Sequence, residues 1–66
     1  MNKEIAQYIN DLLADRERLM EERKDDNNQW QGIPELYSDL KKDTEWELGM
    51  IYQAQKSMDY IIEEDN

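Results

Sequence analysis

The sequence contains no cysteine and no histidine among its 66 residues. Without cysteine, disulfide bonds and thiolate metal sites are excluded, and without histidine the chain lacks the commonest metal ligand and general base. Long apolar runs are missing too, since no stretch approaches the length that spans a bilayer. Residues 1–4 also lack the apolar segment of a secretory signal. We therefore expect a cytoplasmic protein that does not bind membranes.

Positive charge is scarce. Seventeen Asp and Glu residues against eight Lys and Arg residues give a formal net charge of -9. This charge repels nucleic acid phosphates and anionic lipids and favours basic partners, so we expect no direct nucleic acid binding. A chain of 66 residues makes one domain (1–66) and buries too little surface to be more than marginally stable alone. A homodimer or a complex with a partner protein is expected for that reason.

Residues 3–26 contain neither glycine nor proline, and their apolar residues recur at the spacing of one helical face. The recurring residues are Ile5, Ile9, Leu12 and Leu19, and the stripe is widened by Ala6, Leu13 and Met20. Asn2 precedes this run and suits the N-cap position, with Glu4 in the first turn favourable to the helix dipole. The pattern predicts a first helix over 3–26.

Residues 27–33 are mostly polar, with Gly32 just before Pro34, and predict a turn. Pro34 suits the first position of a second helix, which the following apolar period extends over 34–63. Its stripe consists of Leu36, Leu40, Thr44, Ile51, Ala54, Met58 and Ile62. Gly49 interrupts it, and predicts either a locally weak helix or a close packing contact.

Folding the second helix back on the first brings the two stripes together in one consistent pairing. The pairs, whose residue numbers all add to 63, are Ile5 with Met58, Ile9 with Ala54, Leu12 with Ile51, Leu19 with Thr44 and Arg23 with Leu40. The same register places Arg16 opposite Glu47, which predicts a core ion pair, buried or half-buried, in the seam. Such a pair penalises slipped registers; the alternative is that both side chains extend outward into solvent. The predicted fold is an all-α antiparallel two-helix hairpin of the coiled-coil type.

A second apolar row follows the second helix, roughly 65° to 125° away from its hairpin-facing stripe. It contains Trp46, Met50 and Ile61, with Gln53, Ser57 and Tyr60 beside them. Trp, Met and Tyr are common where proteins meet, so Trp46, Met50, Tyr60 and Ile61 are predicted interface residues. The alternative is that they fold under the loop or lie singly on the surface. Through this row two hairpins would form a four-helix bundle as a homodimer, or one hairpin would dock on a different protein.

Five acidic residues, spaced seven, four, seven and four apart, share one side of the first helix within roughly 60°. This acidic row consists of Glu4, Asp11, Asp15, Glu22 and Asp26. The row could engage an Arg- or Lys-lined groove on another protein, including one built to bind nucleic acid. Glu63, Glu64 and Asp65 should extend it into a patch near Glu4, because an antiparallel hairpin brings its two ends together. The alternative is a solvated helix face without a partner.

Catalytic motifs are absent, and no cofactor or metal site is predicted. The segment 25–36 has the length of a calcium loop, but Trp30 and Leu36 occupy the positions that require Gly and Glu. There is no phosphate-binding loop and no nucleophile motif, and a hairpin lacks a deep pocket. We expect that the chain is not an enzyme.

The residues match no family motif. In size and charge the chain is similar to small acidic helical proteins that block a basic surface, such as phage-encoded inhibitors, nucleic acid mimics and some antitoxins. That similarity implies a protein–protein interaction module that inhibits a basic, nucleic-acid-handling partner through the acidic row. The alternative function is a structural or adaptor protein that acts through helix-mediated oligomerisation, with its charge serving only solubility.

Overall fold

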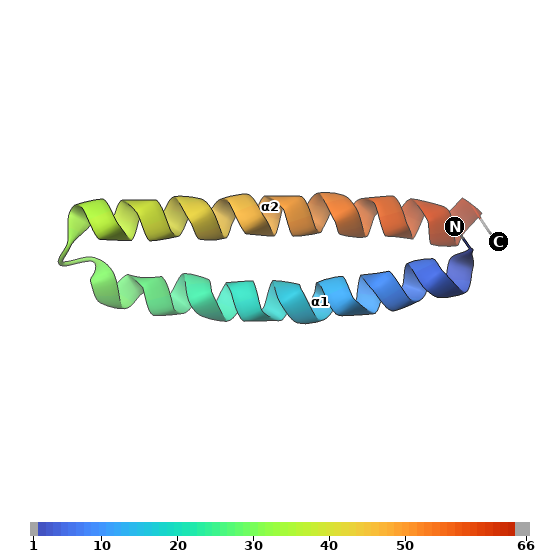
Figure 1. Cartoon of the computed structure of the whole chain (residues 1–66), viewed down its shortest axis with the longest axis horizontal. Coiled ribbons are helices and arrows are strands. Elements are labelled where there is room, and N and C mark those ends of the chain that lie inside the picture. The colour runs from blue at the N-terminus through green and yellow to red at the C-terminus, as the bar shows by residue number, and fades with distance from the viewer. Residues whose placement is uncertain (1, 65–66) are drawn as a thin grey trace.

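The computed structural model describes residues 2–64 and consists of two long helices lying side by side and antiparallel (Figure 1). Helix α1 spans Lys3–Asp26 and helix α2 spans Pro34–Glu64, one residue beyond the predicted 63. A short 3-10 helix, η1 (Asn27–Trp30), and residues 31–33 make the connection. The described part of the chain contains no strand. The fold is thus the all-α antiparallel hairpin that the two apolar periods predict.

The helix ends follow from local chemistry. The predicted N-cap is confirmed, because the backbone N–H of Ile5 donates a 2.9 Å hydrogen bond to Asn2 Oδ1. Pro34 is the first residue of α2, where its missing N–H costs no helical hydrogen bond. Arg23 and Lys24 lie in the last turn of α1, where positive charge complements the helix dipole.

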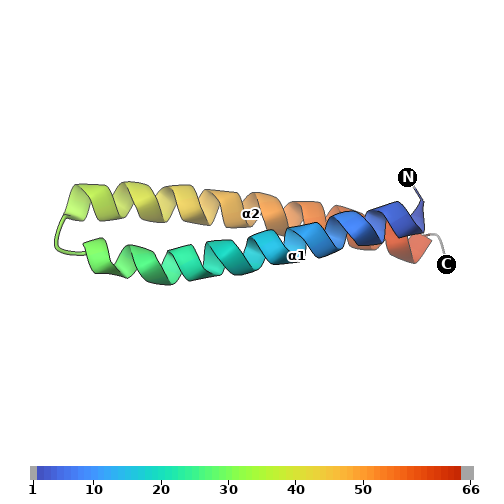
Figure 2. The same ribbon diagram turned by 60° about the horizontal axis from the view of Figure 1, so that its bottom comes forward.

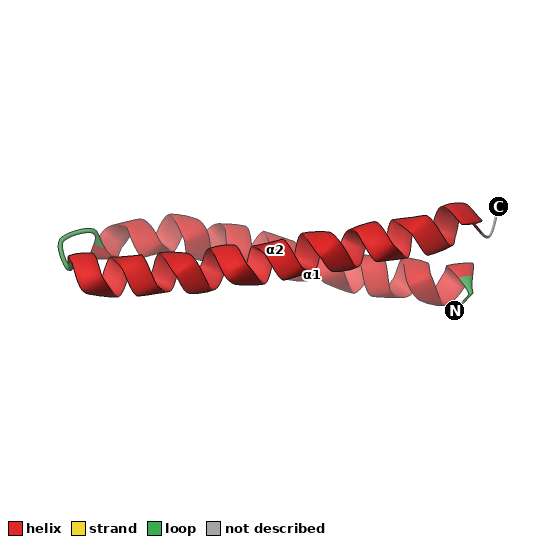
Figure 3. Cartoon of the chain, turned by 90° about the horizontal axis from the view of Figure 1, so that it is seen from above, coloured by secondary structure: helices red, strands yellow, loops and turns green. Residues whose placement is uncertain are grey.

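The two helices wind around each other at a shallow angle (Figures 2 and 3) and give a thin rod of 50 × 14 × 12 Å. Its core is a single line of contacts. Met20 of α1 packs with Leu48 and Ile51 of α2, and Leu13 packs against this cluster. Ala6, fully buried, extends the line toward the N-terminus. A rod only two helices wide has no second layer, so most of its surface faces outward.

The prediction for α2 is confirmed at Thr44 and Ile51, which are both buried, but the prediction for α1 is wrong by one position. Leu13 and Met20 occupy the seam, while Leu12 and Leu19 are 52% and 44% exposed. Ile5, expected opposite Met58, is half exposed as well. The apolar band of α1 is two rows wide, and α2 covers the row containing Ala6, Leu13 and Met20 instead of the row beside it.

The loop end of the hairpin is fastened by polar contacts. Asn27, at the start of η1, is buried and donates from Nδ2 to Thr44 Oγ1 at 2.9 Å and to the Leu40 carbonyl at 3.3 Å. Thr44 Oγ1 in turn donates to the Leu40 carbonyl. All three groups are satisfied by one another, which lets polar side chains occupy a core position.

Gly49 is a helical residue of α2 with open space around it, since a Cβ atom there would meet nothing within 4 Å. The close packing contact considered from the sequence is therefore not present within the hairpin. Among the described residues, no helix is long and apolar enough to cross a membrane.

Candidate interaction surfaces

The seam between α1 and α2 divides the hairpin into two flanks of opposite character. Successive residues of a helix are about 100° apart, so Arg16 and Glu17 leave α1 on either side of the row formed by Leu13 and Met20. Arg16 bonds to Glu47 of α2, whereas Glu17 bonds to Gln55. These two contacts identify which residues of α2 lie on which flank.

The flank that contains Glu17 is closed by hydrogen bonds between the helices, and we call it the polar flank. Its three cross-helix bonds are Asn10 Nδ2 to Asp59 Oδ1 at 2.8 Å, Gln55 Nε2 to Glu17 Oε1 at 2.8 Å, and Tyr52 Oη to Glu21 Oε1 at 2.7 Å. These bonds pair polar groups of the two helices along much of the rod, while Asn10 Oδ1 is buried without a hydrogen-bond partner. This flank therefore offers little unpaired apolar surface to a partner.

Tyr52, on this flank, has a displaced pKa. The hydrogen bond to the Glu21 carboxylate raises the pKa of the Tyr52 hydroxyl above its ordinary value of 10.0, and desolvation and the charges of Glu21 and Glu17 act in the same direction. Only the protonated hydroxyl can donate this bond.

The opposite flank carries exposed apolar side chains from both helices, and we call it the open apolar face. Its members are Ile5, Leu12 and Leu19 from α1 with Trp46 and Met50 from α2, and Arg16 and Glu47 lie in its middle. Trp46 is 71% exposed and Met50 52% exposed. Exposed apolar side chains gathered on one side of a hairpin in this way are typical of an interaction surface.

Arg16 and Glu47 form an ion pair at the centre of this face. Arg16 Nη2 and Glu47 Oε1 are 2.5 Å apart, and Arg16 Nε donates to the same oxygen at 3.0 Å. Their side chains are 48% and 34% exposed, so the pair lies half-buried at the rim of the seam, within the buried or half-buried range that the sequence predicts. Both side chains are long enough for their charged ends to meet on the solvent side of the apolar contacts.

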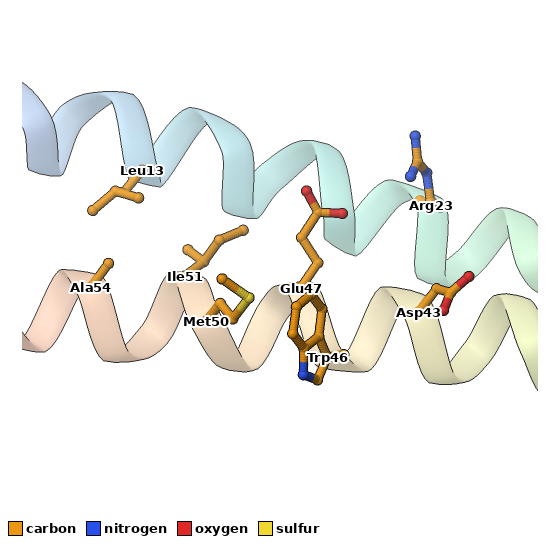
Figure 4. A pocket seen from close by; sticks show the side chains of 8 residues that line it. All are labelled: Leu13, Arg23, Asp43, Trp46, Glu47, Met50, Ile51 and Ala54. Carbon is orange, nitrogen blue, oxygen red and sulfur yellow. The ribbon is translucent and has the colours of Figure 1, made fainter.

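A shallow groove runs along this face across both helices (Figure 4). It is lined by Leu13 and Arg23 of α1 and by Asp43, Trp46, Glu47, Met50, Ile51 and Ala54 of α2. In Figure 4 the Glu47 side chain reaches toward α1, whereas the Trp46 ring lies away from it. Core side chains therefore form the floor of the groove. Its edge on α2 is formed by Trp46, a large side chain that no other part of the hairpin covers.

The other two predicted interface residues continue this surface toward the C-terminal end of α2. Tyr60 is 65% exposed, while Ile61 is half-buried. With Gln53, Lys56 and Ser57 they line a second shallow depression. The predicted second row of α2 is thus brought to one side of the helix, with Trp46, Met50 and Tyr60 the most open positions.

The acidic row lies on the side of α1 that points away from α2, and all five of its residues are exposed. Two of them contact neighbours within α1: Gln7 Nε2 donates to Asp11 Oδ1 at 3.1 Å, and Arg18 Nη1 to Glu22 Oε1 at 3.2 Å. Glu4 lies at the same end of the rod as the close of α2, where Glu63 and Glu64 are exposed (Figure 1). Asp65, which the sequence adds to this patch, lies outside the described residues.

No group of three or more acidic residues within 2–64 is placed to hold a metal ion. Compared with protein-family models, with curated proteins and with solved structures, the chain has no match. Its function is therefore inferred from the surfaces described above.

Sequence reasoning missed the α1 half of the open apolar face. It assigned Ile5, Leu12 and Leu19 to the hairpin seam, and so described an interface on α2 alone. The signal was present in the sequence, because two apolar rows one residue apart on α1 are more than a single facing helix can cover.

Proposed function

We propose that this chain is a small acidic protein–protein interaction module that binds and blocks a basic surface of another protein, in the manner of a phage-encoded inhibitor or an antitoxin. The observation that carries the proposal is the acidic row, five exposed carboxylates along one side of α1 facing away from α2. A partner can reach the row without disturbing the hairpin.

The spacing of the row supports a basic, nucleic-acid-handling partner. Asp11 and Asp15 are one helical turn apart and Glu22 and Asp26 likewise, so charges repeat every 6 to 10 Å or so along the axis. Phosphates of one nucleic acid strand repeat at intervals of about 3.4 Å along the helix axis, so the carboxylates of the row would match every second or third phosphate. The net charge of -9 attracts such a partner over a distance and speeds the encounter.

The test begins with affinity capture of partners from the native host and identification by mass spectrometry. A captured protein is then titrated with wild type, with the row variant D11Q/D15Q/E22Q and with the control variant E35Q/D39Q/E45Q. The control acids are exposed on α2, and both variants lose three negative charges. Circular dichroism establishes that each variant stays helical.

The proposal expects a basic partner whose affinity falls at least about tenfold in the row variant and much less in the control, with added salt weakening the wild-type complex. It also expects wild type to displace a nucleic acid from that partner. Equal losses in both variants would show that net charge alone acts. Unchanged affinity in both would rule out binding through the acidic row.

A second candidate function is that of a structural or adaptor protein acting through helix-mediated assembly. The open apolar face favours it, because Trp46 and Met50 are large side chains held in the open by a rigid helix. In that function the acids serve only solubility, and the row variant would leave every interaction unchanged.

A further inference from the structure

The open apolar face exposes large apolar side chains that the two helices of the hairpin leave uncovered, and we infer that a second copy of this chain covers it. The two hairpins lie face to face with their loops at the same end, and form a four-helix bundle. This inference does not rest on the acidic row, which points away from α2 and has Asp15 and Glu22 beside Leu19 at the edge of the face.

The size of the face fits a dimer. The rod measures 50 × 14 Å along this side, roughly 700 Å² of surface, close to the roughly 800 Å² per partner of a standard protein interface. Covering it would bury Leu12 and Leu19 of α1 together with Met50 of α2, which are now half exposed. Such a layer supplies the second core that a two-helix rod lacks.

The charges on the face are complementary to those of its own copy. The α1 half carries Arg16 and Arg23, and the α2 half carries Asp43 and Glu47. A two-fold axis along the rod places α1 of each copy over α2 of the other, so each positive half meets a negative half. Arg16 and Glu47 of the two copies then alternate in sign around the centre of the bundle.

The other face-to-face arrangement places the loops at opposite ends, with α1 lying over the partner's α1. Arg16, near the middle of α1, would then face its own symmetry mate across an apolar layer. Like charges placed together in an interface strongly weaken association. The charge pattern therefore selects the arrangement with the loops at the same end.

The apolar side chains agree with this choice. Met20 packs with Leu48, so Leu19 lies at a level of the rod between Trp46 and Met50. A two-fold axis along the rod preserves that level. It brings Leu19 of one copy against Trp46 and Met50 of the partner subunit, which lets the exposed indole ring pack on an aliphatic side chain.

Arg23 and Asp43 provide the test, because within residues 2–64 neither forms an ion pair. In the proposed dimer Arg23 of each copy faces Asp43 of the other. The variants are R23E and D43K, and their matched controls are K24E and E45K. Arg23 and Lys24 share the last turn of α1, so both reversals disturb the helix dipole equally. All are measured by sedimentation velocity over micromolar concentrations, with circular dichroism as the check on folding.

We expect wild type, K24E and E45K to be dimers, and R23E and D43K to dimerise at least about tenfold more weakly, because each reversal puts two like charges face to face at two sites. Mixing R23E with D43K restores the dimer, since both contacts in the mixed species again join opposite charges. A monomeric wild type overturns the inference. So does a wild-type dimer in which R23E and D43K are no weaker than their controls, or in which the mixture stays dissociated, because either result places another surface or another arrangement at the interface.

Discussion

Gly49 makes α2 less stable than alanine would at the same position. It lies inside α2, and no side chain or neighbouring backbone occupies the space a Cβ atom would take. Replacing it with alanine removes unfolded-state entropy without adding a clash. We predict that G49A raises the free energy of unfolding by about 1 kcal/mol. Chemical denaturation followed by circular dichroism measures this, and a destabilised G49A would mean that something packs closely at this position.

Tyr52 should make the stability of the hairpin sensitive to alkaline pH. Its pKa is raised in the folded chain, chiefly by the hydrogen bond to Glu21, and the bond exists only while the hydroxyl is protonated. A group whose pKa is raised on folding stabilises the fold below its unfolded pKa. That stabilisation is therefore present below pH 10 and is lost as pH rises through the higher folded value.

The measurement is a titration of phenolate absorbance in wild type, Y52F and E21Q. Wild type should show one tyrosine ionising later than in the unfolded chain, and Y52F should lack this late phase. In E21Q the phase moves toward lower pH, because a neutral amide accepts the hydrogen bond without repelling the phenolate. A late phase that persists in Y52F would assign the raised pKa to another residue.

At the scale of the helices, the ion pair between Arg16 and Glu47 links α1 to α2 by charge. We predict that R16E and E47R each lower the free energy of unfolding by about 0.5 to 1 kcal/mol, the usual range for a partly exposed pair. The double variant R16E/E47R should recover most of the loss, because the pair is restored with its charges exchanged. Denaturation of all four proteins at one fixed concentration measures the coupling. Two harmless single reversals would show that the pair does not stabilise the fold.

The sequence predicts the helices themselves well, because their ends depend on local chemistry. Asn2 caps α1, Pro34 begins α2, and the polar segment between them contains no residue of either apolar stripe. Periodicity alone predicts part of the side of α2 that faces α1, since Thr44 and Ile51 of its stripe are buried. Leu36 of the same stripe is 39% exposed, and the core residue Leu48 is not part of it.

Periodicity does not predict the rotation of α1, because Leu12 and Leu13 are equally apolar neighbours. The choice between them depends on polar partners from the other helix, which no single-helix pattern contains. With Leu13 and Met20 in the seam, Glu17 reaches Gln55 and Glu21 reaches Tyr52. Buried or half-buried polar groups need such partners, so these contacts settle a choice that the apolar residues leave open.

The whole molecule is a rod with one flank that is closed by hydrogen bonds and one flank that exposes apolar side chains. Cross-helix hydrogen bonds close the polar flank, whereas the opposite flank exposes Trp46 and Met50 beside the groove. The acidic row occupies a third side, on the outer surface of α1. Pairing two rods through the open apolar face would leave both acidic rows at the outer edges of the bundle, free to meet basic partners.

The two tryptophans allow the most direct test of this account, because Trp46 lies on the open apolar face and Trp30 lies in η1 at the loop end. Sedimentation equilibrium of wild type, W46A and W30A at micromolar concentration compares the same substitution at the two sites. We predict that wild type and W30A sediment with twice the 8.0 kDa mass of one chain, and that W46A dissociates toward the monomer. A wild-type mass of one chain, or equal masses for W46A and W30A, would contradict the account.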